Sequence, residues 1–367
     1  MHLCDLAPAH IRAIAPYQPG KPISELAREM GLAEANIVKL ASNENPLGAS
    51  PRARAAIAAH LDEVALYPDG NGFELKAALV EHLGVDLSGI VLGNGSNDVL
   101  ELVAHALLGP GTSAVYSEHA FAVYPLATQA TGARGIAVPA RAHGHDLAAM
   151  RDAIRADTRV VFIANPNNPT GTLLGAEELH GFLASLPPGV AVVLDEAYGE
   201  FLDTALRAPS VDWLAEFPDL ILTRTFSKAY GLAGLRVGYA LARPEVADLL
   251  NRVRQPFNVN SLALAGAAAA LGDDEFIARS KAVNDAGMAQ LLEGCRRLGL
   301  NHIPSHGNFL CIEVGDAAGV FQSLLRRGVI VRPVANYGLP GFLRVSIGLP
   351  EQNARFLAAL AEILEQA

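Results

Sequence analysis

The sequence has 367 residues, of which 51% are hydrophobic and 18% are charged, and its formal net charge at pH 7 is -10. This length allows two domains, because a single hydrophobic core stops growing at roughly 250 to 300 residues. The negative charge excludes a broad positive field, so we expect binding neither to nucleic acid nor to an anionic membrane.

The amino-terminal stretch, MHLCDLAPAHIRAIAPY, has no basic region followed by an apolar run, so it is unlike a secretion signal. The longest apolar stretch, residues 261–272, is shorter than the roughly 20 residues that cross a membrane. Cys4, Cys295 and Cys311 are far apart, and no C-x-x-C motif or nearby histidine pair suggests zinc. We therefore expect a cytoplasmic protein without a metal site.

Residues 1–41 are predicted to form an arm that packs with a small domain, and residues 42–255 to form a large α/β domain. In the large domain, short apolar runs alternate with helical stretches, which is typical of a mainly parallel, seven-stranded sheet between helices. The predicted strands are residues 89–92, 113–117, 134–138, 159–164, 190–195, 220–223 and 236–241. Ligands bind at the carboxyl ends of such strands.

The pattern of predicted helices and strands changes after residue 255. An alanine-rich helix and a polar helix over 273–298 are followed by three apolar runs and a closing helix that begins at Glu351. This order predicts a smaller α+β domain over 256–367.

The loop that follows the first strand of the large domain contains Gly93 and Gly95, and a helix is expected to begin at about Asn97. Backbone N–H groups at such a helix start, with Ser96 beside them, form a typical anion site. A plain helix cap is the alternative. The spacing is not that of a dinucleotide-binding loop, because Asp98 stands where a third glycine is needed.

Three polar side chains follow other strands of the same sheet. Asp195 ends one strand, where a buried carboxylate needs a cation or a protonated nitrogen; a cap or salt bridge is the alternative. Tyr198 follows three residues later, and a packed core tyrosine is its alternative. Asn168 lies in the turn NPNNPTG, which could also form without any ligand.

The stretch LTRTFSKAYGLAGLRVGY places Lys228 after another strand, at the same predicted edge. The other four lysines stand in polar or turn contexts. A lysine that is desolvated or close to other cations loses its proton easily and can react with an aldehyde. Arg236 offers a planar guanidinium for a phosphate. A phosphate, an aldehyde, a ring nitrogen and a phenolic oxygen occur together in pyridoxal 5'-phosphate, which we expect as the cofactor.

These motifs resemble the fold-type I pyridoxal-phosphate aminotransferases and, within them, the histidinol-phosphate aminotransferases. The resemblance covers essentially the whole chain, through PYQPGKP, KLASNENPLG, YPDG, GNGSND, NPNNPTG, LDEAY, TFSKAYGLAGLRVGY and YGLPGFLRVSIG. It implies a fold-type I architecture with a large cofactor-binding domain and a smaller α+β domain.

The resemblance also implies the roles of the site residues. Lys228 would bind the cofactor covalently and act as catalytic base, Asp195 would keep the pyridine nitrogen protonated, and Tyr198 would hydrogen-bond the ring oxygen. The remaining cofactor contacts would be Asn168 on the ring oxygen, Phe121 on the ring face, Gly95, Ser96, Asn97, Ser227 and Arg236 on the phosphate, and Tyr67 from a second subunit.

Arg344 matches the position that binds a substrate carboxylate in the superfamily, with a surface ion pair as the alternative. In the histidinol-phosphate branch, Tyr17, Arg332 and Arg344 would hold the substrate phosphate, and Asn43 would line the entrance. The resemblance therefore implies a homodimer that converts imidazole-acetol phosphate and L-glutamate to histidinol phosphate and 2-oxoglutarate in histidine biosynthesis.

Two other enzymes of the same fold remain alternatives, an aromatic amino acid aminotransferase and a threonine-phosphate decarboxylase. A coenzyme-binding regulator is disfavoured because the chain lacks room and basic charge for a DNA-binding domain, and an NAD-dependent oxidoreductase is disfavoured by the loop spacing.

Overall fold

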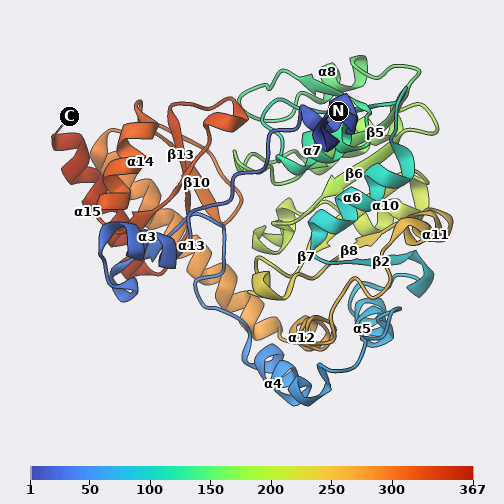
Figure 1. The fold of residues 1–367 in the computed structure, drawn as a ribbon, viewed down its shortest axis with the longest axis horizontal. Coiled ribbons are helices and arrows are strands. Elements are labelled where there is room, and N and C mark those ends of the chain that lie inside the picture. Colours follow the sequence, from blue (N-terminus) through green and yellow to red (C-terminus); the bar gives the residue numbers. More distant parts are fainter. Residues whose placement is uncertain (1, 367) are drawn as a thin grey trace.

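The computed structural model describes residues 2–366. It has two parts, each built on its own sheet, and the amino-terminal segment runs from one part to the other (Figure 1). No helix in the described range combines the length and the apolar character that a bilayer-spanning segment requires.

The larger sheet has seven strands within residues 2–366, as the sequence predicts. They are β2 (Ile90–Gly93), β3 (Ser113–Ser117), β4 (Arg134–Val138), β5 (Thr158–Ala164), β6 (Ala191–Asp195), β7 (Leu220–Thr225) and β8 (Gly238–Leu241). Their order is β2-β8-β7-β6-β5-β3-β4, and every pairing is parallel except those of β8 with β2 and β7. The β7–β8 connection contains no α-helix, only the 3-10 helix η6 (Ala233–Leu235), and β8 returns antiparallel.

Both faces of this sheet are covered, which explains the continuous apolar runs. In β5, Val160 and Phe162 contribute to one core and Val161 and Ile163 to the other, because successive side chains of a strand point to opposite faces. One face packs against α6 (Ser96–Leu107), α7 (Val123–Ala130) and α11 (Pro244–Val253). The other packs against α5 (Phe73–Leu83), α8 (Leu147–Asp152), α9 (Ala176–Ala184), α10 (Ser210–Glu216) and α12 (Ser261–Leu271).

The smaller sheet is antiparallel in the order β12-β13-β10-β9. Its strands are β9 (His302–Ile303), β10 (Phe309–Glu313), β12 (Arg332–Pro333) and β13 (Phe342–Ser346), and its core is closed by α13 (Asp274–Leu298), α14 (Ala317–Arg326) and α15 (Pro350–Glu365). The short 3-10 helices of the chain are η1 (Glu34–Asn36), η2 (Leu61–Glu63), η3 (Leu87–Gly89), η4 (Gly199–Phe201), η5 (Thr204–Leu206), η6 (Ala233–Leu235) and η7 (Ala335–Tyr337).

The expected two-part α/β architecture is thus confirmed. The boundary between its parts stays a proposal, and the packing of α12 bears on it. This helix lies against α4 (Pro51–Ala59) and α5 and contributes Ala263 and Ala267 to the core of the large sheet. We therefore propose that the large domain extends through α12, beyond the expected limit at residue 255.

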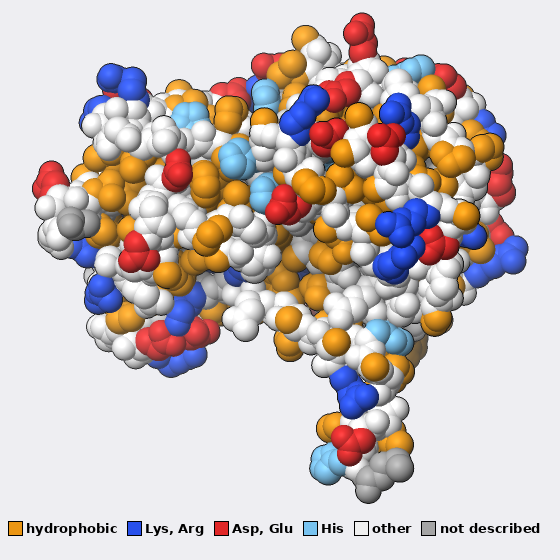
Figure 2. Space-filling view, turned by 90° about the horizontal axis from the view of Figure 1, so that it is seen from above, with side chains coloured by type: hydrophobic (Ala, Val, Ile, Leu, Met, Phe, Trp, Pro, Cys, Tyr) orange, Lys and Arg blue, Asp and Glu red, His pale blue; other side chains and the backbone are white. Residues whose placement is uncertain are grey.

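The amino-terminal arm contains three short helices, α1 (Leu3–Leu6), α2 (Ala9–Arg12) and α3 (Ile23–Met30). Helix α3 buries Leu26 against Leu325 and Ile330 of the small domain. Next to it, β1 (Val38–Lys39) pairs in parallel with β11 (Val329–Ile330). The segment that carries α1 forms a narrow projection from the body of the molecule (Figure 2), and Leu3 on it is 80% exposed.

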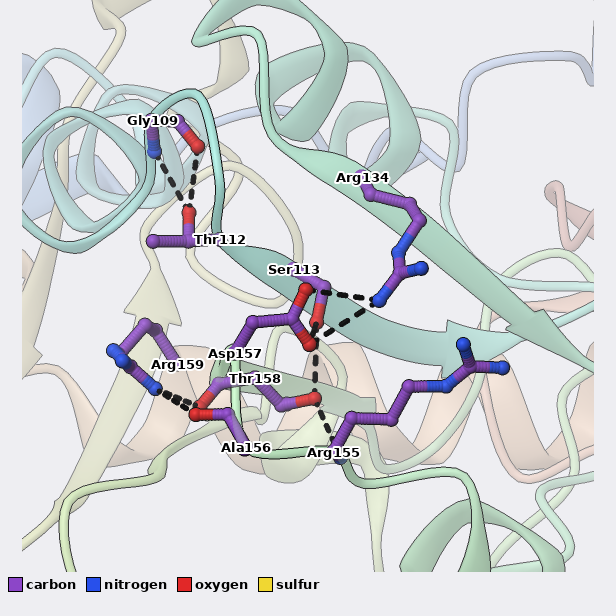
Figure 3. A network of polar contacts seen from close by, with 9 residues as sticks. All are labelled: Gly109, Thr112, Ser113, Arg134, Arg155, Ala156, Asp157, Thr158 and Arg159. Atoms are coloured by element: carbon purple, nitrogen blue, oxygen red, sulfur yellow. Dashed lines mark hydrogen bonds and ion pairs between the residues drawn. The ribbon is translucent and has the colours of Figure 1, made fainter.

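A polar network lies at the amino ends of β3, β4 and β5 (Figure 3). Asp157 accepts hydrogen bonds from the guanidinium of Arg134 at 2.9 Å and from the hydroxyl of Ser113 at 3.3 Å. The hydroxyl of Thr158 lies 3.0 Å from that of Ser113 and accepts from the backbone N–H of Arg155. The network provides hydrogen-bond partners for the buried hydroxyls of Ser113 and Thr158. It lies at the amino edge of the sheet, opposite the carboxyl edge at which a ligand site is expected.

Candidate functional site

A cavity of about 410 Å³ opens at the carboxyl edge of the large sheet, between the arm and the two domains. Thirteen residues predicted from the sequence line it: Tyr17, Asn43, Ser96, Asn97, Phe121, Asn168, Asp195, Tyr198, Ser227, Lys228, Arg236, Arg332 and Arg344. Parallel strands end at one edge of a sheet, which explains why residues so far apart in the chain meet.

One end of the cavity is the start of α6. Gly95 has φ 85°, a left-handed conformation that a residue with a Cβ rarely adopts, and it lets the chain turn from β2 into the helix. Asp98 fixes this loop, since its carboxylate accepts hydrogen bonds from the backbone N–H of Asn94 and the side chain of Asn258, both at 2.8 Å. The N–H groups of the first turn of α6 can therefore bind an anion.

Arg236 lies against the same loop. A Cβ added at Gly95 would be 2.5 Å from Nη2 of Arg236, and one at Gly238 would collide with the backbone nitrogen of Ser96. Nη1 of Arg236 donates to the carbonyl of Ala233 at 3.0 Å and lies 3.5 Å from Oγ of Ser227. The two glycines thus make space for a guanidinium and a helix start to act on one anion.

Asp195 forms part of the cavity wall and is 5% exposed. Its carboxylate accepts hydrogen bonds from the hydroxyl of Tyr124 at 2.9 Å and from the backbone N–H of Ala197 at 3.2 Å. Burial raises the pKa of Asp195, although these hydrogen bonds oppose the rise. A protonated ring nitrogen would compensate the buried charge.

Lys228 lies in the loop between β7 and β8, and its Nζ donates to the carbonyl of Ser42, just after the arm, at 3.2 Å. Burial, and after it the positive charge of Arg344, lower the pKa of Lys228 to about 8. A larger fraction of this amine is therefore neutral near pH 7 than in an exposed lysine, as a nucleophile or base requires.

Two amides and a phenol lie between these groups. Asn43, in a left-handed conformation with φ 54°, donates through Nδ2 to the hydroxyl of Tyr198 at 3.0 Å. Burial raises the pKa of Tyr198 to about 12, so its hydroxyl stays protonated and can donate. Asn168 accepts from Nη1 of Arg344 at 2.6 Å through Oδ1, which leaves its Nδ2 to face a ligand.

The other end of the cavity carries two neighbouring arginines. Arg332 and Arg344 are paired residues on β12 and β13, so their side chains leave the same face of the sheet. Arg344 is 7% exposed and donates through Nη2 to the carbonyl of Ala41 at 2.7 Å. Arg332 donates to the carbonyl of Gln18 at 2.6 Å and lies 5.6 Å from the ring centre of Tyr17.

Neither arginine has a carboxylate within ion-pair distance in the described part of the chain. Two adjacent cations without an anion are costly, which favours an anionic ligand between them. The surface ion pair that was the alternative for Arg344 does not form.

Phe121 lies at the cavity wall and makes an edge-to-face contact with Tyr124. Tyr67 lies elsewhere: its side chain is 83% exposed, and its ring stacks on Phe257 at 4.8 Å. Within one chain, therefore, Tyr67 does not reach the cavity.

The sequence interpretation missed two supporting features. Tyr124 was not singled out as the partner of Asp195, although it stands in the same stretch as Phe121. Behind Asp195, the guanidinium of Arg224 pairs with the carboxylate of Glu196 at 2.9 Å and connects β7 to the segment after β6. A charged arginine within an otherwise apolar strand, LILTRT, was the available signal.

The expectation that all other lysines stand in polar or turn contexts was wrong for Lys76. This residue is 6% exposed and donates to the side chain of Asn71 at 3.0 Å. Burial lowers its pKa as well.

Comparisons with known proteins agree with this geometry. The family model described as aminotransferase class I and II matches residues 35–360. Histidinol-phosphate aminotransferase 2 of Nitrosospira multiformis is 63% identical over 100% of this chain and 93% of its own length. Histidinol-phosphate aminotransferase 1 of Thiobacillus denitrificans is 66% identical over 98% of this chain and 94% of its own.

Solved structures give the same result. The histidinol-phosphate aminotransferase of Sinorhizobium meliloti in complex with pyridoxal-5'-phosphate superimposes with a TM-score of 0.89 at 27% identity, over 98% of each chain. An L-threonine-O-3-phosphate decarboxylase from Porphyromonas gingivalis, at 24% identity and a TM-score of 0.80, shares the fold alone. The resemblance derived from the motifs is confirmed: the chain belongs to the class I and II aminotransferases and, within them, to the histidinol-phosphate aminotransferases.

Proposed function

We propose that this protein is a pyridoxal 5'-phosphate-dependent aminotransferase that interconverts imidazole-acetol phosphate plus L-glutamate and histidinol phosphate plus 2-oxoglutarate, a step of histidine biosynthesis. The observation that carries this proposal is the position of Lys228, a partly buried amine between two separate cationic ends of one cavity. One end suits the phosphate of a cofactor, and the other suits the anionic group of a substrate.

The residues present fit the cofactor. The start of α6 with Arg236 forms a cradle that a Cβ at Gly95 or Gly238 would fill, which suits a phosphate. The buried carboxylate of Asp195 suits a protonated pyridine nitrogen, and the protonated hydroxyl of Tyr198 suits a phenolic oxygen.

The bound cofactor supplies an aldehyde for the amino group of the substrate and a ring that withdraws electrons from its α-carbon. Nζ of Lys228, mostly neutral at a pH above about 8, would accept the proton from the α-carbon of the substrate and return it later in the reaction. Asp195 would hold a proton on the ring nitrogen by hydrogen bonding and charge, and Tyr124 keeps the carboxylate of Asp195 in place.

The arginine pair supports histidinol phosphate as the substrate. Arg332 and Arg344 stand side by side on adjacent strands, and two guanidinium groups match the charge of a phosphate better than that of a single carboxylate. Glutamate, the amino donor, would place one of its carboxylates on the same pair. Curated relatives at 60–66% identity over nearly the whole chain bear the name of this enzyme, and the aromatic transaminase and decarboxylase alternatives are not favoured.

Absorption spectroscopy and product analysis test the proposal. Adding L-glutamate to the cofactor-loaded enzyme should convert the spectrum of the lysine-bound cofactor to that of the pyridoxamine form. The ratio kcat/KM should be higher for histidinol phosphate than for phenylalanine, and no carbon dioxide should be released. If no amino donor changes the spectrum, the protein is not a transaminase; if phenylalanine is the better substrate, the substrate assignment is wrong.

We propose in addition that the protein acts as a homodimer, in which Tyr67 reaches the cofactor phosphate of the partner subunit. Support comes from the exposure of Tyr67 and of neighbouring apolar side chains, among them Leu66 at 70% and Phe73 at 54%. Analytical ultracentrifugation should give twice the chain mass, and Tyr67→Phe should weaken cofactor binding. The cytoplasmic location stays a prediction.

A further inference from the structure

The proposed substrate differs from other amino donors by its imidazole ring, and this inference rests on the function proposed above. An imidazole carries an N–H donor, and with an ordinary pKa of about 6.5 it is partly protonated at neutral pH. Its natural partner is a carboxylate. Among the described residues that line the cavity, two have carboxylates, Asp195 and Glu44.

Asp195 is not available to the side chain of the substrate. It is buried, it holds two hydrogen bonds from the protein, and its position suits the ring nitrogen of the cofactor. A substrate side chain cannot use the same carboxylate while the cofactor is bound. Glu44 is therefore the acidic group that the substrate can reach.

Glu44 follows Asn43 directly in the chain, just after the arm, and lines the cavity. Its Oε1 accepts from Nζ of Lys39 at 2.7 Å, and its side chain is 46% exposed. Oε2 has no hydrogen bond to any described residue. Nζ of Lys228 donates to the carbonyl of Ser42, two residues before Glu44, at 3.2 Å, and the negative charge of Glu44 opposes the fall in the pKa of Lys228.

The amide oxygens of Asn43 and Asn168 and the two arginines are less suitable partners. The amide oxygen of Asn43 accepts from Ser346 at 3.0 Å, and that of Asn168 accepts from Arg344. Arg332 and Arg344 only donate. We propose that Glu44 is a specificity-determining residue that binds the imidazole N–H of histidinol phosphate through its second carboxylate oxygen.

A charged hydrogen bond of this kind discriminates against a phenyl ring, which would leave the carboxylate without its partner. Because Glu44 is nearly half exposed, its hydrogen bond to the substrate should be among the weaker ones that charged groups make. We expect it to contribute a factor of about ten in affinity. The residue should act on binding and leave the rate of the chemical step unchanged.

The test compares two probes that share the amine and the phosphate. One is histidinol phosphate, and the other is 2-amino-3-phenylpropyl phosphate, in which phenyl replaces imidazole. Dissociation constants are measured by calorimetry on cofactor-loaded protein that carries Lys228→Ala to prevent turnover. Glu44→Gln is added to this background, and KM and kcat are measured in parallel without Lys228→Ala.

The chain offers a matched control in Glu29, which is also 46% exposed and also paired with a lysine, Lys21, but lies outside the cavity. Lys39→Met is the second control, because it breaks the Lys39–Glu44 ion pair and keeps the carboxylate. Thermal unfolding confirms that each variant is folded.

We expect Glu44→Gln to raise the dissociation constant of histidinol phosphate about tenfold, with a matching rise in KM and an unchanged kcat. The dissociation constant of the phenyl probe should change by less than about twofold. Glu29→Gln and Lys39→Met should keep the preference for imidazole. The proposal is overturned if Glu44→Gln weakens both probes equally or neither, or if Lys39→Met removes the preference as well. If the unmutated enzyme fails to transaminate histidinol phosphate, the proposed function is wrong instead.

Discussion

The lowered pKa of Lys228 makes a prediction about the stability of the cofactor-free protein. Burial lowers this pKa from 10.5 to about 8, so the folded protein binds a proton on Lys228 less readily than the unfolded chain does. At pH 7 both states are protonated, and the folded state carries a desolvated ammonium. Replacing Lys228 by Met removes that charge and should raise the free energy of unfolding at pH 7.

The size of the effect follows from the difference between the two pKa values. One pKa unit corresponds to about 1.4 kcal/mol, so the full difference gives about 3 kcal/mol. The amine faces an open cavity, and we therefore expect about 2 kcal/mol. Between pH 8 and pH 10.5 the unfolded chain holds the proton that the folded chain has lost, so the wild-type stability should rise with pH and the advantage of Lys228→Met should shrink.

Urea unfolding of both cofactor-free proteins, followed by circular dichroism at pH 7, 8.5 and 10, measures this difference. Lys281→Met is the control, because Lys281 lies in ion pairs with Asp203 and Asp285 and its pKa is raised. The stability that Lys281 contributes is present below its unfolded pKa and is lost only above it, so its variant should show a constant difference up to pH 10. A difference between wild type and Lys228→Met that changes by less than about 0.5 kcal/mol from pH 7 to pH 10 would refute the reasoning.

Three further changes test the site. Asp195→Asn should keep the cofactor but lower kcat by about 100- to 1000-fold, because an amide cannot hold the ring proton; a variant with normal kcat would contradict this role. Tyr124→Phe removes one hydrogen bond to Asp195 and should lower kcat by about tenfold, a loss that steady-state kinetics would detect and that unchanged rates would disprove. Gly238→Ala should displace the start of α6 and weaken cofactor binding, which equilibrium dialysis measures. Gly109→Ala, whose Cβ would meet nothing within 4 Å, should bind the cofactor normally. Equal affinities of the two variants would contradict the proposed phosphate site at the start of α6.

Much of the fold could be predicted because its signals are local. Most strands of the large sheet are buried on both faces and are continuous apolar runs, whereas the edge strand β4 is largely exposed; all seven strands appear where the sequence predicts them. The placement of α12 was harder, because an alanine-rich helix has no polar face that would indicate its neighbours. Its packing on α4 and α5 depends on the path of the chain.

The sequence by itself determined which residues meet at the site from the large domain. Ser96, Asn168, Asp195 and Lys228 each follow a strand, and the strands of a mainly parallel sheet end at one edge. A strand order was not needed for this conclusion, because it depends only on strand direction.

Only the tertiary structure decided the other half of the cavity. Asn43 reaches Tyr198 across 155 residues and Ser346 across 303, and Arg332 stands beside Arg344 through strand register. Such contacts leave no periodic trace in the sequence, since they arise when the segment after the arm and the small domain pack on the large domain. The lowered pKa of Lys228 has the same origin, because desolvation depends on the atoms that surround a group in the folded chain.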